Sequence, residues 1–175
     1  MIRKIYILQS LALLMIVSLF SGNLYPAGKN WSSFNAGLDR AKKENKYILI
    51  DFYTDWCHWC KVMDEKTFKD KTVEKKLMDR FVTIRLNAED AKSKVSYQNK
   101  TLNNVELTRY FGINGFPSLA FLDPKGNPVT VIPGYIPADT FLHILNYIDE
   151  KCHERKISFE DYVKNGGCKE KDKQS

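Results

Sequence analysis

Helical spacing of apolar side chains marks the first ordered stretch of the chain, at residues 31–41. Apolar residues recur there three and four positions apart, which is the pattern of one buried helix face. The series consists of Trp31, Phe34, Leu38 and Ala41. Further helix-compatible stretches lie at 58–66, 70–79, 105–111 and 138–151. We therefore predict a helix at each of these places.

Short runs of β-branched and aromatic residues predict the strands. They lie at 47–53, 81–86, 118–122 and 129–132. The run at 47–53 is almost continuously apolar, which is typical of a strand buried on both faces of a sheet. The turn sequence at 123–127 predicts a hairpin, whereas the polar residues 87–104 predict a long connection. This order of elements predicts an α/β fold in which helices flank both faces of a central mixed sheet.

The two ends of the chain predict separate segments. A positive charge at Arg3 precedes an apolar run at 5–20, as in a secretory signal peptide, with a retained membrane anchor as the alternative. Near the other end, an apolar pattern that stops at Gly166 predicts a short helix. We divide the chain into a signal peptide at 1–27, a main domain at 28–151 and a C-terminal extension at 152–175. Export would place the protein in the periplasm, where disulfides persist.

The composition is that of a soluble globular protein, with 43% hydrophobic and 27% charged residues. The formal net charge is +6, but the lysines are spread among acidic residues rather than gathered in one block. A mixed-charge surface of this kind argues against a nucleic-acid partner. We therefore expect no nucleic-acid partner. We also expect a monomer.

Two of the four cysteines, Cys57 and Cys60, are separated by two residues where a predicted strand meets a predicted helix. A structural zinc site needs four ligands, and the sequence has no second Cys-x-x-Cys motif, so we expect no metal. A purely structural disulfide here would close a very short loop and stabilise little. The partial positive charge of a helix N-terminus favours a thiolate. We therefore predict that Cys57 attacks a substrate and that Cys60, expected to be the more buried, resolves the mixed disulfide.

The remaining cysteines lie in the C-terminal extension. Four cysteines allow three pairings, and pairing Cys57 with Cys60 leaves Cys152 with Cys168. Such a bond would close a loop long enough to stabilise the fold by about 3 kcal/mol on the entropic model. We predict a structural clip that fixes the extension to the last helix, with electron relay to Cys57 as the alternative.

Three short stretches together resemble the thioredoxin superfamily. They are residues 50–61 with the Cys-x-x-Cys motif, the Gly-Phe-Pro-Ser sequence at 115–118, and Gly134 ahead of the last helix of the main domain. The resemblance covers residues 31–151, most of the main domain. It implies a thioredoxin fold and a dithiol chemistry that needs no bound cofactor.

Two subfamilies share finer sequence details with this chain. Residues 51–57 and 65–68 resemble the C-terminal domain of the transmembrane thiol:disulfide interchange protein of Gram-negative bacteria. Residues 133–135 and 159–162 are similar to periplasmic thioredoxins found with sulfur-oxidation systems. Both likenesses imply a periplasmic location.

The resemblance also implies roles for further residues. Asp51 is an acid inside an apolar strand, which is costly to bury unless it serves a purpose, and it takes the role of general base for Cys60. The Phe116–Pro117 bond is expected to be cis, with the backbone at Phe116 binding an extended substrate segment. For Trp56, a place in the core is an equal alternative to a place at the site. The expected substrate-binding residues are Trp56, Trp59, Phe116 and Pro117.

The sequence thus predicts an exported thiol:disulfide oxidoreductase that acts on protein substrates. Asp51 and the apolar Phe116 favour a reductase over an oxidase, by family analogy. A reductase in the periplasm needs a membrane electron donor of the thiol:disulfide interchange type, because no glutathione buffer recharges it there. The alternatives are an oxidase or isomerase of the same fold, a non-catalytic binding module, and a metal carrier.

Overall fold

The computed structural model describes residues 31–169, and the predicted signal peptide at 1–27 lies outside the described residues. The helices are α2 (Phe34–Glu44), α3 (His58–Met63), α4 (Lys71–Arg80), α5 (Asn104–Tyr110), α6 (Ala138–Asp149) and α7 (Phe159–Asn165), with a π-helix, η2 (Asp64–Phe68), directly after α3. The strands are β1 (Tyr47–Tyr53), β2 (Phe81–Asn87), β3 (Val95–Tyr97), β4 (Lys100–Leu102), β5 (Ser118–Leu122) and β6 (Pro128–Pro133). Within residues 31–169, no helix combines the length and the apolar character needed to cross a membrane.

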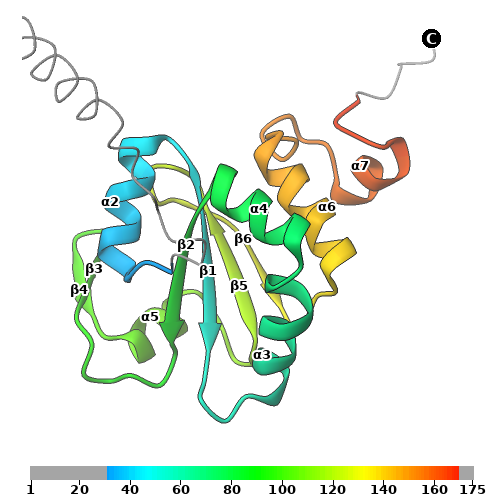
Figure 1. The fold of residues 1–175 in the computed structure, drawn as a ribbon. Helices are drawn as coiled ribbons and strands as arrows, with labels where there is room; N and C mark the ends of the chain where they lie inside the picture. Colours follow the sequence, from blue (N-terminus) through cyan, green and yellow to red (C-terminus); the bar gives the residue numbers. More distant parts are fainter. Residues whose placement is uncertain (1–30, 170–175) are drawn as a thin grey trace, which may run out of the picture.

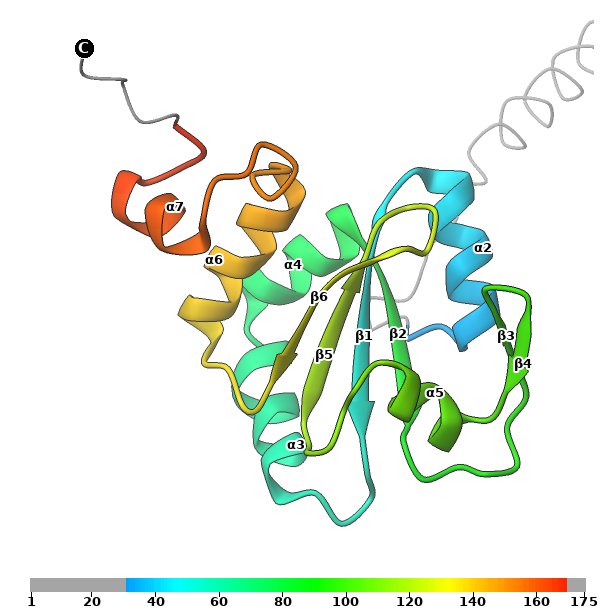
Figure 2. The same ribbon diagram turned by 180° about the vertical axis from the view of Figure 1, so that it is seen from behind.

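The central sheet has the strand order β2-β1-β5-β6 (Figure 1). β1 runs parallel to β2 and antiparallel to β5, and β5 pairs antiparallel with β6. Figures 1 and 2 show α2 and α5 on one face of this sheet and α3, α4 and α6 on the other. The layers therefore form the mixed sheet between helices that the order of elements predicts.

β1 lies in the middle of the sheet, and its side chains enter both halves of the core. Ile50 and Phe52 pack under α2 and α5, whereas Tyr47 and Leu49 pack under α3, α4 and α6. Asp51 alternates with its neighbours along the strand in the same way, so its side chain lies on the face of Leu49. The sequence of β1 thus places one carboxylate beneath α3, in an otherwise apolar layer.

The first helix and the helix after β1 differ from their predicted bounds. α2 begins at Phe34 with Ser33 as its N-cap, so Trp31 precedes the helix instead of starting it. The Trp31 ring packs edge-on against Phe68, with centroids 5.3 Å apart. The helix predicted at 58–66 is an α-helix only as far as Met63 and then widens into η2. Single π-turns inside helices occur frequently at functional sites, because they change the direction of the side chains that follow.

The polar connection at 87–104 contains a small hairpin, β3–β4, which the sequence analysis missed. Its turn residues Gln98 and Asn99 have φ values of 47° and 63°, the left-handed conformation that tight hairpin turns require. The Tyr97 hydroxyl donates a hydrogen bond to the Gly126 carbonyl at 2.9 Å, which ties the hairpin to the turn between β5 and β6. The connection is therefore packed against the domain.

The C-terminal extension folds back onto α6. α6 ends at Asp149, two residues earlier than predicted, and α7 begins after the N-cap Ser158. Cys152 and Cys168 are joined by a disulfide, with Cα atoms 5.4 Å apart. Figures 1 and 2 place α7 at the end of the molecule opposite to α3. The two disulfides of the chain are therefore well separated in space.

Candidate active site

The Cys-x-x-Cys motif lies where β1 leads into α3. Cys57 is the N-cap residue of α3, and its Sγ accepts a hydrogen bond from the Cys60 backbone N–H at 3.0 Å. The two cysteines form a disulfide, with Cα atoms 5.3 Å apart. In the reduced protein the same N–H would stabilise a thiolate at Cys57, because hydrogen bonds to the charged form favour it. The local geometry therefore favours Cys57 as the attacking sulfur.

The two cysteines are equally buried, contrary to the prediction that Cys60 is the deeper of the pair. Cys57 is 3% exposed and Cys60 is 4% exposed in the disulfide form. What distinguishes the two sulfurs is the helix N-cap position of Cys57 rather than its exposure.

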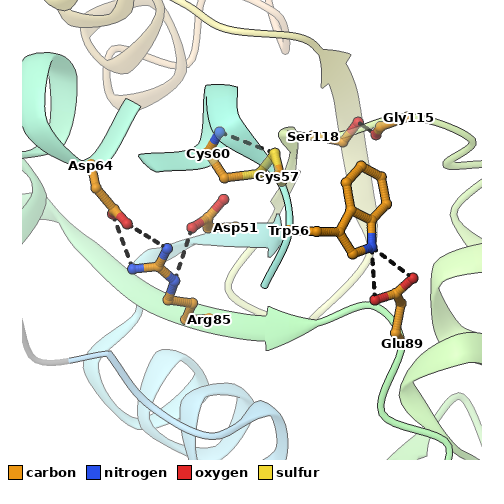
Figure 3. The surroundings of a disulfide bond; sticks show 9 residues. All are labelled: Asp51, Trp56, Cys57, Cys60, Asp64, Arg85, Glu89, Gly115 and Ser118. Atoms are coloured by element: carbon orange, nitrogen blue, oxygen red, sulfur yellow. Dashed lines mark hydrogen bonds and ion pairs between the residues drawn. A yellow bond between two sulfur atoms is a disulfide. The ribbon is translucent and has the colours of Figure 1, made fainter. Parts of the chain in front are cut away.

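Asp51 is buried beneath the disulfide, with 1% of its surface exposed. In Figure 3 its carboxylate points toward the disulfide on one side and toward Arg85 on the other. Arg85 is its register partner on the parallel strand β2, and the distance from Arg85 Nε to Asp51 Oδ2 is 3.3 Å. The predicted acid is therefore at the site, but it is part of an ion pair that the sequence analysis did not foresee.

Arg85 also binds Asp64, the first residue of η2. Its two terminal nitrogens donate hydrogen bonds to the two carboxylate oxygens of Asp64 at 3.0 Å and 2.7 Å. Burial alone would lower the pKa of Arg85, but the hydrogen bond to Asp64 and the negative charges of Asp51 and Asp64 outweigh it and raise that pKa. Arg85 is therefore a permanent cation between β1 and the helix that carries Cys60.

An aromatic pair stands on one side of the disulfide. Trp56 is 67% exposed, so the alternative that placed it in the core is wrong. Its ring meets Phe116 edge-on, with centroids 6.2 Å apart. Its indole N–H donates to both carboxylate oxygens of Glu89 at 3.0 Å, as Figure 3 shows. The exposed ring is thus held in one orientation.

Trp59, the residue before Cys60, forms a second aromatic pair. Trp59 is 55% exposed, and its ring lies 5.5 Å from that of Tyr135, measured between centroids. Tyr135 follows Gly134, whose φ of 88° suits glycine and whose N–H donates to the Pro117 carbonyl at 2.8 Å. The sequence analysis missed Tyr135, although its place directly after that glycine was a usable signal.

The loop before β5 completes the site. The Phe116–Pro117 peptide bond is cis. The Ser118 hydroxyl donates to the Gly115 carbonyl at 2.8 Å, which closes this loop on itself (Figure 3). Phe116 is half-buried and Pro117 is buried. The structure thus brings Asp51 and the expected substrate-binding residues together around one disulfide.

Metal-ligand geometry occurs elsewhere in the described part of the chain. Glu150, Cys152 and Cys168 place one possible ligand atom each within 4.8 Å of one another. The two sulfurs are joined to each other in a disulfide, so neither offers a thiolate to a metal in this state. The group joins the end of α6 to the extension, away from Cys57.

Comparisons with known proteins show which proteins the chain resembles. A family model described as a thioredoxin-like domain matches residues 34–149. The thiol:disulfide interchange protein DsbD of Actinobacillus pleuropneumoniae is 31% identical over 107 residues, which is 60% of this chain and 17% of that protein. DsbD of Escherichia coli K12 is 32% identical over 118 residues, 65% of this chain and 18% of that protein. The chain thus spans less than a fifth of the length of these relatives.

Solved structures share the fold. A thioredoxin-fold protein from Helicobacter pylori superimposes with a TM-score of 0.58 at 22% identity, over 70% of this chain and 80% of that one. At this identity the likeness concerns the fold alone. It confirms the fold class that the order of elements and the motif predict.

Proposed function

The chain belongs to the thioredoxin-like domain family, and from this premise we propose that it is a periplasmic oxidoreductase that reduces disulfides in protein partners. The observation that carries the proposal is the Cys57–Cys60 pair at the start of α3, with the Cys60 N–H donating to the Cys57 sulfur. The named relatives are thiol:disulfide interchange proteins, which agrees with this chemistry.

The reaction consists of two exchanges. The Cys57 thiolate attacks one sulfur of the partner's disulfide, and the partner's other sulfur leaves as a thiolate. Cys60 then loses its proton to Asp51 and attacks the Cys57 sulfur, which breaks the bond to the partner. The partner leaves with two thiols after protonation, and the chain keeps the Cys57–Cys60 disulfide. The cysteines carry both electrons, so the reaction needs no bound cofactor.

The Cys57–Cys60 disulfide of such a reductase must be reduced again after each reaction. We assign this step to a membrane protein that offers a dithiol, since the periplasm is kept oxidising and supplies no reducing thiol buffer. Export by the segment at 1–27 would place the chain on that side of the membrane. The preference for reduction rests on the buried Asp51 and the apolar Phe116 beside the disulfide.

The reduction potential of the Cys57–Cys60 couple tests the direction. We expect a value near the thioredoxin figure of about −270 mV after equilibration of the purified chain with a thiol buffer. Quantifying alkylated peptides by mass spectrometry separates this couple from Cys152–Cys168. A value near about −120 mV, that of a strong oxidant, would instead assign the chain as a disulfide donor.

Removing the Tyr135 ring is expected to slow reaction with proteins more than reaction with small disulfides. In Tyr135→Ala, Trp59 keeps its contact with the His58 ring but loses the Tyr135 ring, so its apolar face is held less firmly and kcat/KM for a protein disulfide should fall by about fivefold. The rate with a small disulfide should stay unchanged, since the cysteines are untouched. Tyr135→Phe keeps the ring and serves as the matched control. Met78→Ala, which removes an exposed apolar side chain from α4, serves as a second control. Equal slowing of both substrates would contradict a binding role.

A further inference from the structure

The two disulfides of the chain have different electrostatic surroundings. At the active site, the Cys57 sulfur accepts a hydrogen bond from a backbone N–H, which stabilises negative charge on that sulfur. At the Cys152–Cys168 disulfide a carboxylate is the polar neighbour instead, because Glu150 Oε2 lies 3.4 Å from Cys168 Sγ. An oxygen of Glu150 and both sulfurs lie within 4.8 Å of one another. Negative charge on either sulfur of this disulfide would therefore meet a like charge.

The position of the Glu150 carboxylate is set from α6 and α7. Glu150 is the C-cap residue of α6, so its backbone is part of the main domain. From α7, the Tyr162 hydroxyl donates a long hydrogen bond to Glu150 Oε1 at 3.4 Å. Burial and the negative charge of Glu150 raise the pKa of Tyr162, so this hydroxyl keeps the proton that it donates. One oxygen of the carboxylate thus faces Tyr162 and the other faces Cys168.

The two sulfurs of this disulfide differ in their access to solvent. Cys152 is fully buried, with 0% of its surface exposed, whereas Cys168 is half-buried. A thiolate from solvent therefore has to attack Cys168, and Cys152 has to leave as a thiolate in a site that excludes water. Burial disfavours this charged leaving group, and the nearby carboxylate disfavours it further. Both features slow thiol exchange at this disulfide.

Nearby cations offset part of the negative charge. Arg155 donates hydrogen bonds to the backbone carbonyls of Glu150 and Cys168 at 3.1 Å and 3.2 Å. Lys151 and Lys169 are exposed residues that follow these two in sequence, and solvent screens their charge. Glu150 supplies the charge that lies in contact with the Cys168 sulfur. We therefore expect the net field at that sulfur to be negative.

We propose that Glu150 is a specificity-determining residue that protects the Cys152–Cys168 disulfide from thiolate attack, so that the extension stays attached to α6 while the Cys57–Cys60 disulfide is reduced. Reduction of the protected disulfide takes two reagent thiols. The first thiolate bonds to Cys168 as Cys152 leaves, and the second bonds to the first as Cys168 leaves. The reagent becomes a disulfide, and the two cysteine thiolates take protons from water. Because α7 and α3 lie at opposite ends of the molecule (Figures 1 and 2), the inference is independent of the direction of electron flow at Cys57.

Thiols of different charge test the inference directly. The oxidised full-length chain is treated at low ionic strength with cysteamine, which is cationic, or with mercaptoethanesulfonate, which is anionic, at equal thiolate concentration. Alkylation and mass spectrometry of the peptides then follow both disulfides in the same sample. For Cys152–Cys168, we expect the ratio of the cationic to the anionic rate to be at least about fivefold larger in the wild type than in Glu150→Gln. Salt at about 0.5 M should lower the wild-type ratio, because it screens the carboxylate.

Two controls separate the local charge from other effects. Glu160→Gln removes an exposed negative charge from α7 and should keep the wild-type ratio. The rate at Cys57–Cys60 should be the same in Glu150→Gln as in the wild type. Should Glu150→Gln fail to fold, the salt dependence of the wild-type ratio is the remaining test. A ratio that neither salt nor Glu150→Gln changes would overturn the inference and leave the proposed function intact. Failure of the reduced Cys57–Cys60 pair to reduce a protein disulfide would instead overturn the proposed function alone.

Discussion

Serine in place of Cys57 is expected to abolish disulfide reduction, with a loss of at least about a thousandfold in rate. A serine hydroxyl is not ionised near neutral pH, and the backbone N–H of Cys60 does not make it a nucleophile, whereas the same N–H favours a thiolate. The measurement is the reduction of a protein disulfide by the purified chain with a small dithiol as electron source.

Cys60→Ser is the matched control, because it removes the second sulfur and leaves the first. That variant should still attack once and then remain covalently attached to its partner, since nothing resolves the mixed disulfide. The trapped complex is visible by mass spectrometry under non-reducing conditions. If instead Cys60→Ser became the inactive variant and Cys57→Ser the trap, the order of attack proposed from the N-cap position would be wrong. If Cys57→Ser kept full partner binding and cellular function, a non-catalytic binding module would be the better interpretation.

The four strands of the central sheet and the redox motif were predictable because each lies within one local stretch of sequence. Residues 47–53 are apolar except for Asp51 and are mostly β-branched or aromatic, and the structure has β1 over the same residues. The resemblance placed Asp51 at the site, and its burial agrees with that prediction. Local composition was therefore sufficient to predict features that lie within a single strand or helix.

The contacts between elements were not predictable from local patterns. The alternation of polar and apolar residues along β2 predicts that Arg85 faces solvent. Only the parallel register with β1 places it beside Asp51. The widening of the helix after Met63 has no sequence signal that we recognised, and nothing local to Asp64 predicts its hydrogen bonds to Arg85. Tyr135 reaches Trp59 only because β6 returns the chain to the cis-proline loop. In each case the missing information was the three-dimensional register of separate segments.

The extension is held to α6 by contacts that depend on one another. Tyr147 of α6 packs against Phe159 and Tyr162 of α7, with each pair of ring centroids 5.5 Å apart. Arg155 donates to the carbonyls of Glu150 and Cys168 at 3.1 Å and 3.2 Å. α7 is a short helix, and helices of this length are not stable alone in water. Its order must therefore come from these contacts and from the disulfide that closes them.

Removing the Cys152–Cys168 disulfide is accordingly expected to loosen the packing of the extension on α6. We propose Cys168→Ser as the test variant, because it leaves the fully buried Cys152 in place. On the entropic model the lost cross-link costs about 3 kcal/mol of unfolding free energy, which lowers Tm by about 10 °C. Trypsin should also cut sooner at Lys164, within α7. The Cys57→Ser, Cys60→Ser variant opens a shorter loop and should lose less. A Cys168→Ser variant that kept both its Tm and its protease resistance would show that packing of Tyr147 alone holds the extension, and that the disulfide serves another purpose.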